Sequence, residues 1–274
     1  MTDSVQRFAC TGCGACCNRP PEVELTEAAA LADVFVFRLM FRLYWLSDRP
    51  RDRDGTADFY GRKRSLNAFA ARKYAGKGAQ AGNTKYLIIS AVALDTRPGG
   101  CGALDGKLCG IHERRPLGCR SVPLHYSRDE MFAAHDLAVF VATPGFACDT
   151  SDAAPVVVED GRIIDPAMTA ARAEALELAR RGRRWSEAIV RQLGKSLPSL
   201  ADIEANAAIA ATTVSMADAW RVANEIGLIS GEECERLASL QVATIEHELV
   251  RCSAAARQTL VDMRAEYRAG ASWR

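Results

Sequence analysis

The N-terminal region contains four cysteines within eight residues, Cys10, Cys13, Cys16 and Cys17. Thiolates are soft ligands with high affinity for zinc and for iron–sulfur clusters, so a run this dense predicts that these cysteines supply ligands on one side of a metal site. Four more cysteines follow along the chain: Cys101, Cys109, Cys119 and Cys148. Eight thiols are enough for two complete four-thiolate sites.

The composition allows a sizeable core and carries no global electrostatic bias. The chain has 274 residues, 49% of them hydrophobic, which suits one large or two modest domains. Its formal charge is +1, with 35 basic and 34 acidic side chains, so neither nucleic acid nor an anionic membrane is favoured as a partner. The most apolar run, residues 34–46, is too short and too charged to span a bilayer.

The start of the chain lacks the basic and apolar segments of a signal peptide, so we expect a cytoplasmic protein. Glutathione keeps cytosolic thiols reduced, and cysteines there bind metal or take part in catalysis more often than they form disulfides. The cysteines are therefore expected to be metal ligands.

The first 166 residues predict an α+β fold, a small cysteine-rich metal-binding domain with short strands and helices. An extended piece at 23–25 precedes a predicted helix over 28–46, with Thr26 as its N-cap. Residues 86–94 are β-rich and predict a buried strand. Residues 132–141 are apolar, and their periodicity does not decide between helix and strand.

Two further segments of this part have their own signals. Residues 156–164 predict a hairpin, with Asp160-Gly161 as a tight turn between β-branched runs. Residues 48–83 form a basic insert that predicts a solvated loop and a surface helix, with contact to nucleic acid or to an acidic protein as the alternative. Its basic residues are Arg49, Arg51, Arg53, Arg62, Lys63, Arg64, Arg72, Lys73 and Lys77.

Residues 167–274 predict an α-helical C-terminal subdomain, because they are rich in Ala, Leu, Glu and Arg. Three helices are expected. The first spans 167–193, the second runs from about 200 to a C′ glycine at Gly227, and the third runs from a capping box at Ser230 to about residue 269. Trp185, Trp220, Cys234 and Cys252 are expected to pack as apolar residues in these helices.

The spacing of the first three cysteines, Cys-x2-Cys-x2-Cys, forms the first three positions of ferredoxin-type iron–sulfur runs. The fourth cysteine, Cys17, is adjacent to Cys16 instead of three residues further on. Neighbouring side chains usually diverge, so we expect Cys16 and Cys17 to serve different metals. Gly12 and Gly14 suit a tightly wrapped loop, because glycine allows positive φ and a close approach of the backbone.

The segment between Cys101 and Cys109 contains Asp105-Gly106, a hairpin-turn signal. A two-residue turn would set Cys101 and Cys109 on opposite faces of the ribbon, and a three-residue turn would put them on one face. If both cysteines bind one metal, the turn is expected to have odd length, with Gly106 at positive φ.

Arginines follow in the segment around Cys119. An arginine near a dianionic thiolate site offsets its charge and hydrogen-bonds sulfur, so Arg114, Arg115 and Arg120 are candidate second-layer residues around the cofactor. The alternative is that they make ordinary salt bridges.

These motifs, in this order, resemble the bacterial CxxCxxCC (YkgJ-like) cysteine-cluster family, described as zinc- or iron-chelating domains. The pattern is Phe-x-Cys-x2-Cys-Gly-x-Cys-Cys, then Cys-x2-Leu-Asp-x3-Cys-x-Ile-x3-Arg-Pro-x2-Cys-Arg, then a late Cys. The resemblance covers roughly residues 8–150 and implies that all eight of these cysteines are ligands. Flagellin lysine N-methylases look like more distant relatives. Where the family usually has an aromatic residue this chain has His112, which favours a packing role for that histidine over ligation.

Three functions remain open from the sequence. The first is a metal-binding protein whose eight thiolates hold iron, as [4Fe-4S] or another cluster, or zinc. The second, implied by the flagellin methylase resemblance, is an S-adenosylmethionine-dependent protein-lysine N-methyltransferase, although the sequence has no glycine-rich turn to hold that cofactor. The third is a metal-stapled interaction module whose 167–274 helices bind a protein partner or self-associate. No catalytic residue is assigned, and whether the chain is an enzyme is left open.

Overall fold

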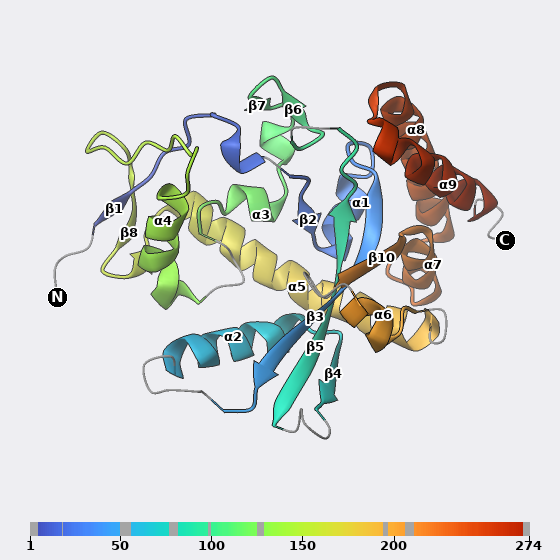
Figure 1. The fold of residues 1–274 in the computed structure, drawn as a ribbon, viewed down its shortest axis with the longest axis horizontal. Helices are drawn as coiled ribbons and strands as arrows, with labels where there is room; N and C mark the ends of the chain where they lie inside the picture. The colour runs from blue at the N-terminus through green and yellow to red at the C-terminus, as the bar shows by residue number, and fades with distance from the viewer. Residues whose placement is uncertain are drawn as a thin grey trace. The chain divides into compact units, whose positions relative to one another are not determined.

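The computed structural model describes residues 5–17, 19–49, 56–76, 82–97, 100–124, 129–193, 197–205 and 211–270. The chain divides into two compact units (Figure 1). Unit 1 comprises Met1–Pro21 and Gly99–Glu177, and unit 2 comprises Glu22–Pro98 and Leu178–Arg274. Helices and several small sheets make up both, as the predicted α+β class requires. The sequence-based division at residue 166 concerns independent folding and stays a prediction.

Unit 1 contains two small antiparallel sheets joined by short helices. One sheet has the order β1 (Gln6–Arg7), β8 (Val156–Glu159) and β9 (Arg162–Ile163), and the other pairs β6 (Leu104–Asp105) with β7 (Leu108–Cys109). The helical elements are η1 (Ala15–Cys17), η3 (His112–Arg114), α3 (Leu117–Arg120), η4 (Glu130–Phe132), α4 (Ala133–Val141) and the first part of α5 (Pro166–Leu193). The core of this unit gathers Phe8, Leu124, Leu137, Val157 and Val158, and Cys148 packs against it.

The backbone conformation of unit 1 tests two predictions. The hairpin at 156–164 is confirmed as β8 and β9, and Asp160 and Gly161 have φ of 47° and 74°. Two consecutive positive φ angles are the mark of a type I′ turn, which matches the twist of the strands it joins. The undecided run at 132–141 is helical, as α4.

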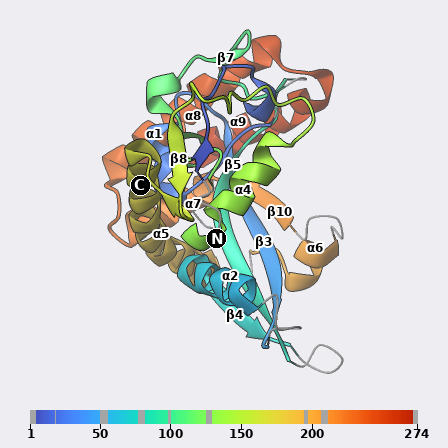
Figure 2. The ribbon, with the colours of Figure 1, turned by 90° about the vertical axis from the view of Figure 1, so that its left-hand side faces the viewer.

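Unit 2 is built on a five-stranded antiparallel sheet. Its order is β10 (Ala211–Ser215), β3 (Phe37–Ser47), β5 (Asn83–Ala93) and β2 (Glu22–Val23), and β4 (Arg72–Ala75) also pairs with β5. Figure 2 shows β3 and β5 running side by side, and they pair over all eleven residues of each strand. The predicted strand at 86–94 is confirmed as β5. The helices are α1 (Leu25–Ala30), α2 (Thr56–Phe69), the second part of α5, α6 (Leu200–Ala205), α7 (Ala217–Glu225), α8 (Gly231–Arg251) and α9 (Ala254–Gly270).

The predicted helix over 28–46 is wrong. Helix α1 ends at Ala30, and its N-cap is Glu24, which forms a reciprocal capping box with Glu27. Residues 37–47 form strand β3, which lies between β10 and β5. The consecutive residues Leu39, Met40 and Phe41 of β3 are all buried, so this strand is covered on both faces. Its apolar residues therefore run almost continuously instead of alternating, and such a run cannot be told from a buried helix by periodicity.

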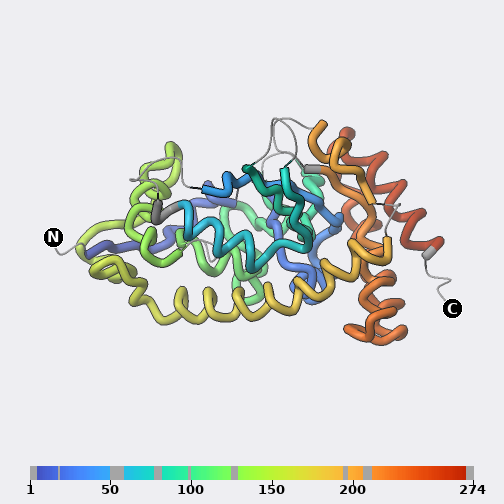
Figure 3. Tube along the Cα trace, turned by 90° about the horizontal axis from the view of Figure 1, so that it is seen from below, coloured from blue at the N-terminus to red at the C-terminus, as the bar shows by residue number. Residues whose placement is uncertain are grey.

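The C-terminal helices are partly as expected. Helix α5 matches the first one and runs uninterrupted over 28 residues (Figure 3). The second predicted helix, from about residue 200 to Gly227, is wrong. Residues 211–215 form strand β10, which pairs with β3 and separates α6 from α7. Gly227 has the expected positive φ, 70°, and Ser230 caps α8 by accepting a hydrogen bond from the Glu233 N–H.

The third predicted helix is interrupted. Helix α8 ends at Arg251, Cys252 is extended, and the Ser253 N–H donates to the Thr96 carbonyl (2.9 Å) before α9 begins. Trp185 and Trp220 are buried as expected, with ring centroids 5.2 Å apart. No helix in the described part of the chain is long and apolar enough to cross a membrane.

The basic insert contains the expected helix, α2, and also strand β4, which the sequence reading missed. Phe59 of α2 is buried against Leu46, Ala70 and Tyr86, and this small core holds the helix on the sheet. The insert is therefore more than a solvated loop. Residues 50–55 and 77–81, with three of its basic side chains, lie outside the described residues.

A buried glutamine on α8 holds the turn that leads into β3. The Gln241 side chain is fully buried; its Nε2 donates to the carbonyls of Ala32 (2.7 Å) and Phe35 (2.8 Å), and its Oε1 accepts from the Phe37 N–H (2.9 Å). Ala32 and Phe35 lie between α1 and β3, and Phe37 is the first residue of β3. A buried amide on a distant helix therefore satisfies them, as buried backbone polar groups require.

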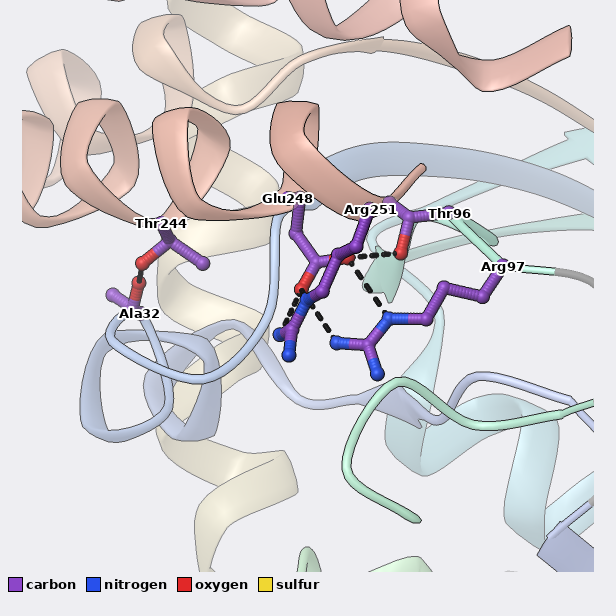
Figure 4. A network of polar contacts seen from close by, with 6 residues as sticks. All are labelled: Ala32, Thr96, Arg97, Thr244, Glu248 and Arg251. Atoms are coloured by element: carbon purple, nitrogen blue, oxygen red, sulfur yellow. Dashed lines mark hydrogen bonds and ion pairs between the residues drawn. The ribbon is translucent and has the colours of Figure 1, made fainter. Parts of the chain in front are cut away.

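A second buried group on α8, Glu248, forms a charged network with the segment that follows β5 (Figure 4). Its carboxylate accepts from the Thr96 hydroxyl (2.6 Å), from Arg97 (2.8 Å) and from Arg251 of the same helix. The Glu248 side chain is only 5% exposed. Burial alone would raise the pKa of this carboxyl, but the hydrogen bonds from Arg97, Thr96 and Arg251 lower it to about 2.

This lowered pKa predicts an acid-sensitive contribution to stability. Because the folded-state pKa lies below the usual value of about 4.3, the contribution is present above that pH and is lost as the pH falls towards 2. We expect Glu248→Gln to destabilise unit 2 by about 1–2 kcal/mol at pH 7, a figure discounted because Arg97 and Arg251 are partly exposed. The difference from wild type is expected to shrink between pH 5 and 2, as measured by urea unfolding at each pH.

The matched control is Glu246→Gln on the same helix. Glu246 also pairs with an arginine, Arg268, but both side chains are about half exposed. An exposed pair contributes little, so this variant is expected to unfold like wild type at all pH values. Equal effects of the two substitutions would contradict the role given to the Glu248 network.

Candidate metal centre

All eight predicted ligands lie in unit 1 and none forms a disulfide. Cys10 is exposed, and the other seven are partly exposed. They come from four segments: the loop of residues 10–17, the segment that runs from Cys101 through the β6–β7 hairpin to Cys109, helix α3 with Cys119, and Cys148. The chain thus supplies reduced thiols from several directions, which is the prerequisite for a thiolate metal site.

An isolated antiparallel bridge aligns the start of the first cysteine run with the last cysteine. Ala9 and Asp149 exchange both backbone hydrogen bonds, at 2.8 and 3.1 Å. The Thr11 hydroxyl donates to the Ala147 carbonyl (2.6 Å). Cys10 and Cys148 lie between these two contacts, each one residue from the bridge.

Cys13 and Cys16 lie near the same pair. The Ala147 backbone N–H donates to the Cys13 sulfur and is the main reason that the pKa of this thiol is lowered. Burial raises the pKa of the Cys148 thiol, and repulsion from the negative charges of Cys13, Cys16 and Cys10 raises it further. Cys10, Cys13 and Cys16 are thus near enough to act on the Cys148 thiol electrostatically.

Cys17 lies beside Cys16 and Cys101. Its carbonyl accepts a hydrogen bond from the Cys101 N–H (2.9 Å), which fixes the two backbones side by side. Burial raises the pKa of the Cys17 thiol to about 12; the charge of the adjacent Cys16 and a side-chain hydrogen bond between the two cysteines raise it further, as do the charges of Cys119 and Cys101. Cys16 and Cys17 both lie in the short 3-10 helix η1.

The β6–β7 hairpin has a turn of even length. Leu104 pairs with Cys109 and Asp105 with Leu108, so the turn is the two-residue Gly106-Lys107 and not the odd length expected if Cys101 and Cys109 bind one metal. Gly106 does have the expected positive φ, 60°. The parity argument does not reach Cys101, because a tight turn, with the Leu104 N–H bound to the Cys101 carbonyl (3.0 Å), takes this cysteine off the ribbon before strand alternation can orient it.

The tip of this hairpin packs on the first cysteine loop. Gly12 and Gly14 both have positive φ, 69° and 75°, as expected for a tightly wrapped loop. A Cβ built on Gly14 would lie 2.9 Å from the Lys107 carbonyl oxygen, and one on Gly12 would lie 2.8 Å from the Leu108 side chain. Glycine at these positions lets the loop and the hairpin approach each other, which brings Cys109 to the edge of the cysteine cluster.

The close approach at Gly14 predicts a large effect of a small substitution. We expect Gly14→Ala to destabilise the protein by about 2–4 kcal/mol, because it adds left-handed backbone strain to a clash with a backbone atom that cannot rotate away. Gly161→Ala is the control: Gly161 also has positive φ, 74°, but a Cβ there meets no atom within 4 Å. Thermal unfolding is expected to show the smaller loss, about 1 kcal/mol, for the control. Equal losses would mean that the hairpin does not press on the loop.

Cys119 is in α3, directly before Arg120. The Arg120 guanidinium pairs with Glu174 (3.1 Å), and Arg115 Nε donates to the His112 carbonyl (3.0 Å), so these two groups bond to oxygen. A role for Arg114, Arg115 and Arg120 near a bound metal stays a prediction. His112 is exposed, and its ring Nδ1 lies 3.3 Å from the neighbouring Glu113 carboxylate, so the packing role expected for this histidine is wrong.

The side chains themselves are not gathered around a point. Within the described residues, no three His, Cys, Asp or Glu side chains converge closely enough to hold a metal ion. What the chain fixes is the backbone of each cysteine segment. A cysteine sulfur moves by rotation about the single χ1 torsion, so the backbone contacts decide which thiolates can meet.

The two remaining cysteines lie in unit 2. Cys234 is buried in α8, and burial raises the pKa of its thiol to about 11. Cys252 contacts the Leu249 carbonyl in the break between α8 and α9. The burial of Cys234 confirms its packing role, whereas Cys252 is only partly buried and lies outside the helix in which it was expected. The sequence did not predict the contact between Thr11 and Ala147, since no local pattern indicates a contact between residues 136 positions apart.

The comparison with protein families agrees with this arrangement. Residues 9–138 match the model of the CxxCxxCC family, whose description is "Putative zinc- or iron-chelating domain". The matched region begins just before the first cysteine and ends after Cys119. A search of curated proteins and a search of solved structures each found no match. The match supports metal chelation and leaves the identity of the metal open.

Proposed function

We propose that this protein binds iron or zinc through the eight thiolates of unit 1, and that iron–sulfur ligation is the better-supported of the two. The observation that carries the proposal is that backbone contacts join distant cysteine segments. The Ala9–Asp149 bridge is one residue from Cys10 and from Cys148, and the Cys17 carbonyl accepts a hydrogen bond from the Cys101 N–H (2.9 Å). Both contacts join parts of the chain that are more than 80 positions apart.

The donor set suits a soft cation. The thiol pKa values of Cys17 and Cys148 are raised partly by repulsion from neighbouring thiolates. A bound cation would remove that repulsion, and thiolates are the ligands that zinc and iron–sulfur clusters prefer. A bound metal ion would place a positive charge among the cysteine side chains of unit 1, and the cysteine thiolates would hold the ion there. Whether the metal then serves electron transfer, metal handling or stability is not assigned.

Iron is favoured by ligand spacing. The run Cys10-x2-Cys13-x2-Cys16 presents three thiolates from one loop, as iron–sulfur runs do. A zinc ribbon would normally use two separate Cys-x2-Cys knuckles, and this chain has no second knuckle. The spacing therefore supports iron over zinc, within the chelation described for the family.

The test is elemental analysis with an ultraviolet–visible spectrum on protein purified without oxygen. Iron, acid-labile sulfide and a broad visible charge-transfer band would support the iron–sulfur form. Colourless protein with stoichiometric zinc would support metal binding and overturn the preference for iron. Folded protein that carries neither metal, and takes up neither on reconstitution, would overturn the proposal.

A further inference from the structure

Unit 2 contains a concentration of positive charge that the balanced total charge of the chain does not reveal. Residues 56–76 and 178–184 together contain nine basic side chains and one acidic side chain, Asp58. Since the whole chain has a formal charge of only +1, its remaining residues are net acidic. We propose that these two stretches form one surface, the α2–α5 basic surface, and that it binds single-stranded nucleic acid. Its basic residues are Arg62, Lys63, Arg64, Arg72, Lys73, Arg180, Arg181, Arg183 and Arg184.

A hydrogen bond joins the two stretches. Arg183 Nη1 of α5 donates to the Asn67 carbonyl of α2 (3.2 Å), although the two residues are 116 positions apart. Both stretches belong to unit 2, and strand β4 follows α2 after two residues. The arginine run of α5 therefore lies beside the basic helix α2, and the positive charges of the two stretches add to one another.

Most of these cations are accessible to a partner. Eight of the nine side chains are exposed, and Lys63 is partly exposed. Among the residues that the structure describes, no carboxylate forms an ion pair with Arg62, Arg72, Lys73 or Arg184. Like charges gathered without carboxylates repel one another, and a bound polyanion relieves that repulsion. The surface is therefore complementary in charge to a chain of phosphates.

Aromatic rings lie among the cations. Lys63 Nζ is 5.4 Å from the centroid of the Phe59 ring, and Lys73 Nζ is 5.8 Å from that of Tyr86. Phe59 and Tyr86 belong to the same small core, so Lys63 and Lys73 lie at the boundary between α2 and the sheet. Tyr60, the residue after Phe59, is 48% exposed. Its ring is thus accessible for stacking next to the basic side chains.

Strand β4 adds cations on both faces of the sheet. Within the described residues β4 pairs with β5 and with no other strand, so it is an edge strand. Side chains alternate along a strand, so the consecutive Arg72 and Lys73 point to opposite faces. The Arg72 guanidinium lies 5.3 Å from the centroid of the Tyr74 ring. A polyanion that crosses this edge would meet positive charge on either side of it.

The combination of cations and rings favours single-stranded nucleic acid over other anions. Arginine and lysine bind the phosphates, and unpaired bases stack on aromatic rings or on guanidinium planes. An acidic protein segment would match the charge, but it would leave the exposed ring of Tyr60 without a flat partner. A duplex keeps its bases stacked inside. RNA and DNA share the phosphates and bases that this surface would bind, and the proposal does not depend on the metal centre of unit 1.

The first experiment measures binding by the full-length protein. Fluorescence anisotropy is recorded with labelled single strands of oligouridine and oligodeoxythymidine over a range of salt concentrations. We expect dissociation constants of about 1–100 µM near physiological salt, as for sequence-independent binding. The logarithm of the affinity is expected to fall with the logarithm of the salt concentration, by about 0.7 for each phosphate contact. Absence of binding to both strands at low salt would overturn the proposal.

Two double variants locate the site. Arg62→Gln with Lys73→Gln removes charge from α2 and β4, and Arg183→Gln with Arg184→Gln removes it from α5. Each is expected to weaken binding about tenfold or more near 0.1 M salt and to reduce the salt dependence by about one phosphate contact or more. All four side chains are exposed, so the variants are expected to unfold in urea as the wild type does.

The matched control is Arg257→Gln with Arg268→Gln on α9. Both side chains are exposed and the change of charge is the same, but neither residue belongs to the basic surface. This control is expected to bind within about twofold of wild type. Tyr60→Leu is expected to weaken binding about fivefold or more without changing the salt dependence, whereas Tyr60→Phe keeps the ring and the affinity.

Three results would contradict the proposal in different ways. Equal loss of affinity in the α9 control and in the surface variants would overturn the location. Displacement of the oligonucleotide by polyglutamate at an equal concentration of negative charge would overturn the preference for nucleic acid and indicate an acidic protein partner. Unchanged binding by Tyr60→Leu would overturn the stacking role of that ring.

Discussion

Replacing Cys13 or Cys119 by serine is expected to lower the bound metal and to destabilise unit 1 more than any other single substitution considered. A hydroxyl is a hard, poorly ionised group and replaces a soft thiolate badly. Loss of a residue that only supports a ligand already costs about 10- to 100-fold in metal affinity, and loss of a ligand is expected to cost more. Structural zinc sites contribute about 10–16 kcal/mol of apparent binding free energy, so a large drop in thermal midpoint is expected.

The controls for this prediction are Cys234→Ala and Cys252→Ala. Both cysteines are in unit 2, and neither is part of the cysteine cluster. Their variants are expected to keep the full metal content, measured by elemental analysis beside the serine variants. If Cys13→Ser and Cys119→Ser kept both wild-type metal stoichiometry and wild-type thermal stability, the ligand assignment would be wrong; metal loss in either control would mean that the site is elsewhere.

Replacing Gln241 by leucine is expected to destabilise unit 2 by about 3–5 kcal/mol. Leucine has a similar volume but no polar atoms, so the Phe37 N–H and the Ala32 and Phe35 carbonyls would lose their side-chain partner in a dry interior. Each buried polar group left unsatisfied costs about 1–3 kcal/mol, partly offset here because Thr244 also bonds the Ala32 carbonyl. Urea unfolding gives the free energy directly.

The matched control is Gln258→Leu on α9. Gln258 is exposed and bonds only a neighbouring carboxylate, Asp262 (2.8 Å). Its replacement is expected to change the free energy of unfolding by less than about 0.5 kcal/mol. Because Gln241 lies in unit 2, its substitution is also expected to leave the metal content unchanged. A cost for Gln241→Leu no larger than that of the control would refute the role given to its amide.

The sequence predicts metal binding more fully than it predicts the fold. The number and spacing of the cysteines predict thiolate ligation without any tertiary information, and the family match supports metal chelation. Positive φ at Gly12, Gly14, Gly106 and Gly227 was also predictable, because each glycine sits in a turn or cap that needs it. These are local properties, and local patterns encode them.

Long-range pairing is where the sequence reading failed. Residues 37–47 became a strand because β10 and β5 cover both edges of it, and neither neighbour is visible from the segment itself. The approach of the segments that carry Cys10 and Cys148 depends on a bridge between Ala9 and Asp149, 140 positions apart. The parity argument did not reach Cys101, since a turn ended the ribbon sooner than its sequence suggested.

The central claim, that thiolates of unit 1 hold the metal, is tested most directly by X-ray absorption at the edge of the bound metal. For zinc or for an iron–sulfur centre, the account predicts a first shell made of sulfur, at about 2.3 Å for zinc. A first shell dominated by nitrogen or oxygen at about 2.0–2.2 Å would contradict it, because it would mean that histidines, carboxylates or water bind the metal in place of the eight cysteines.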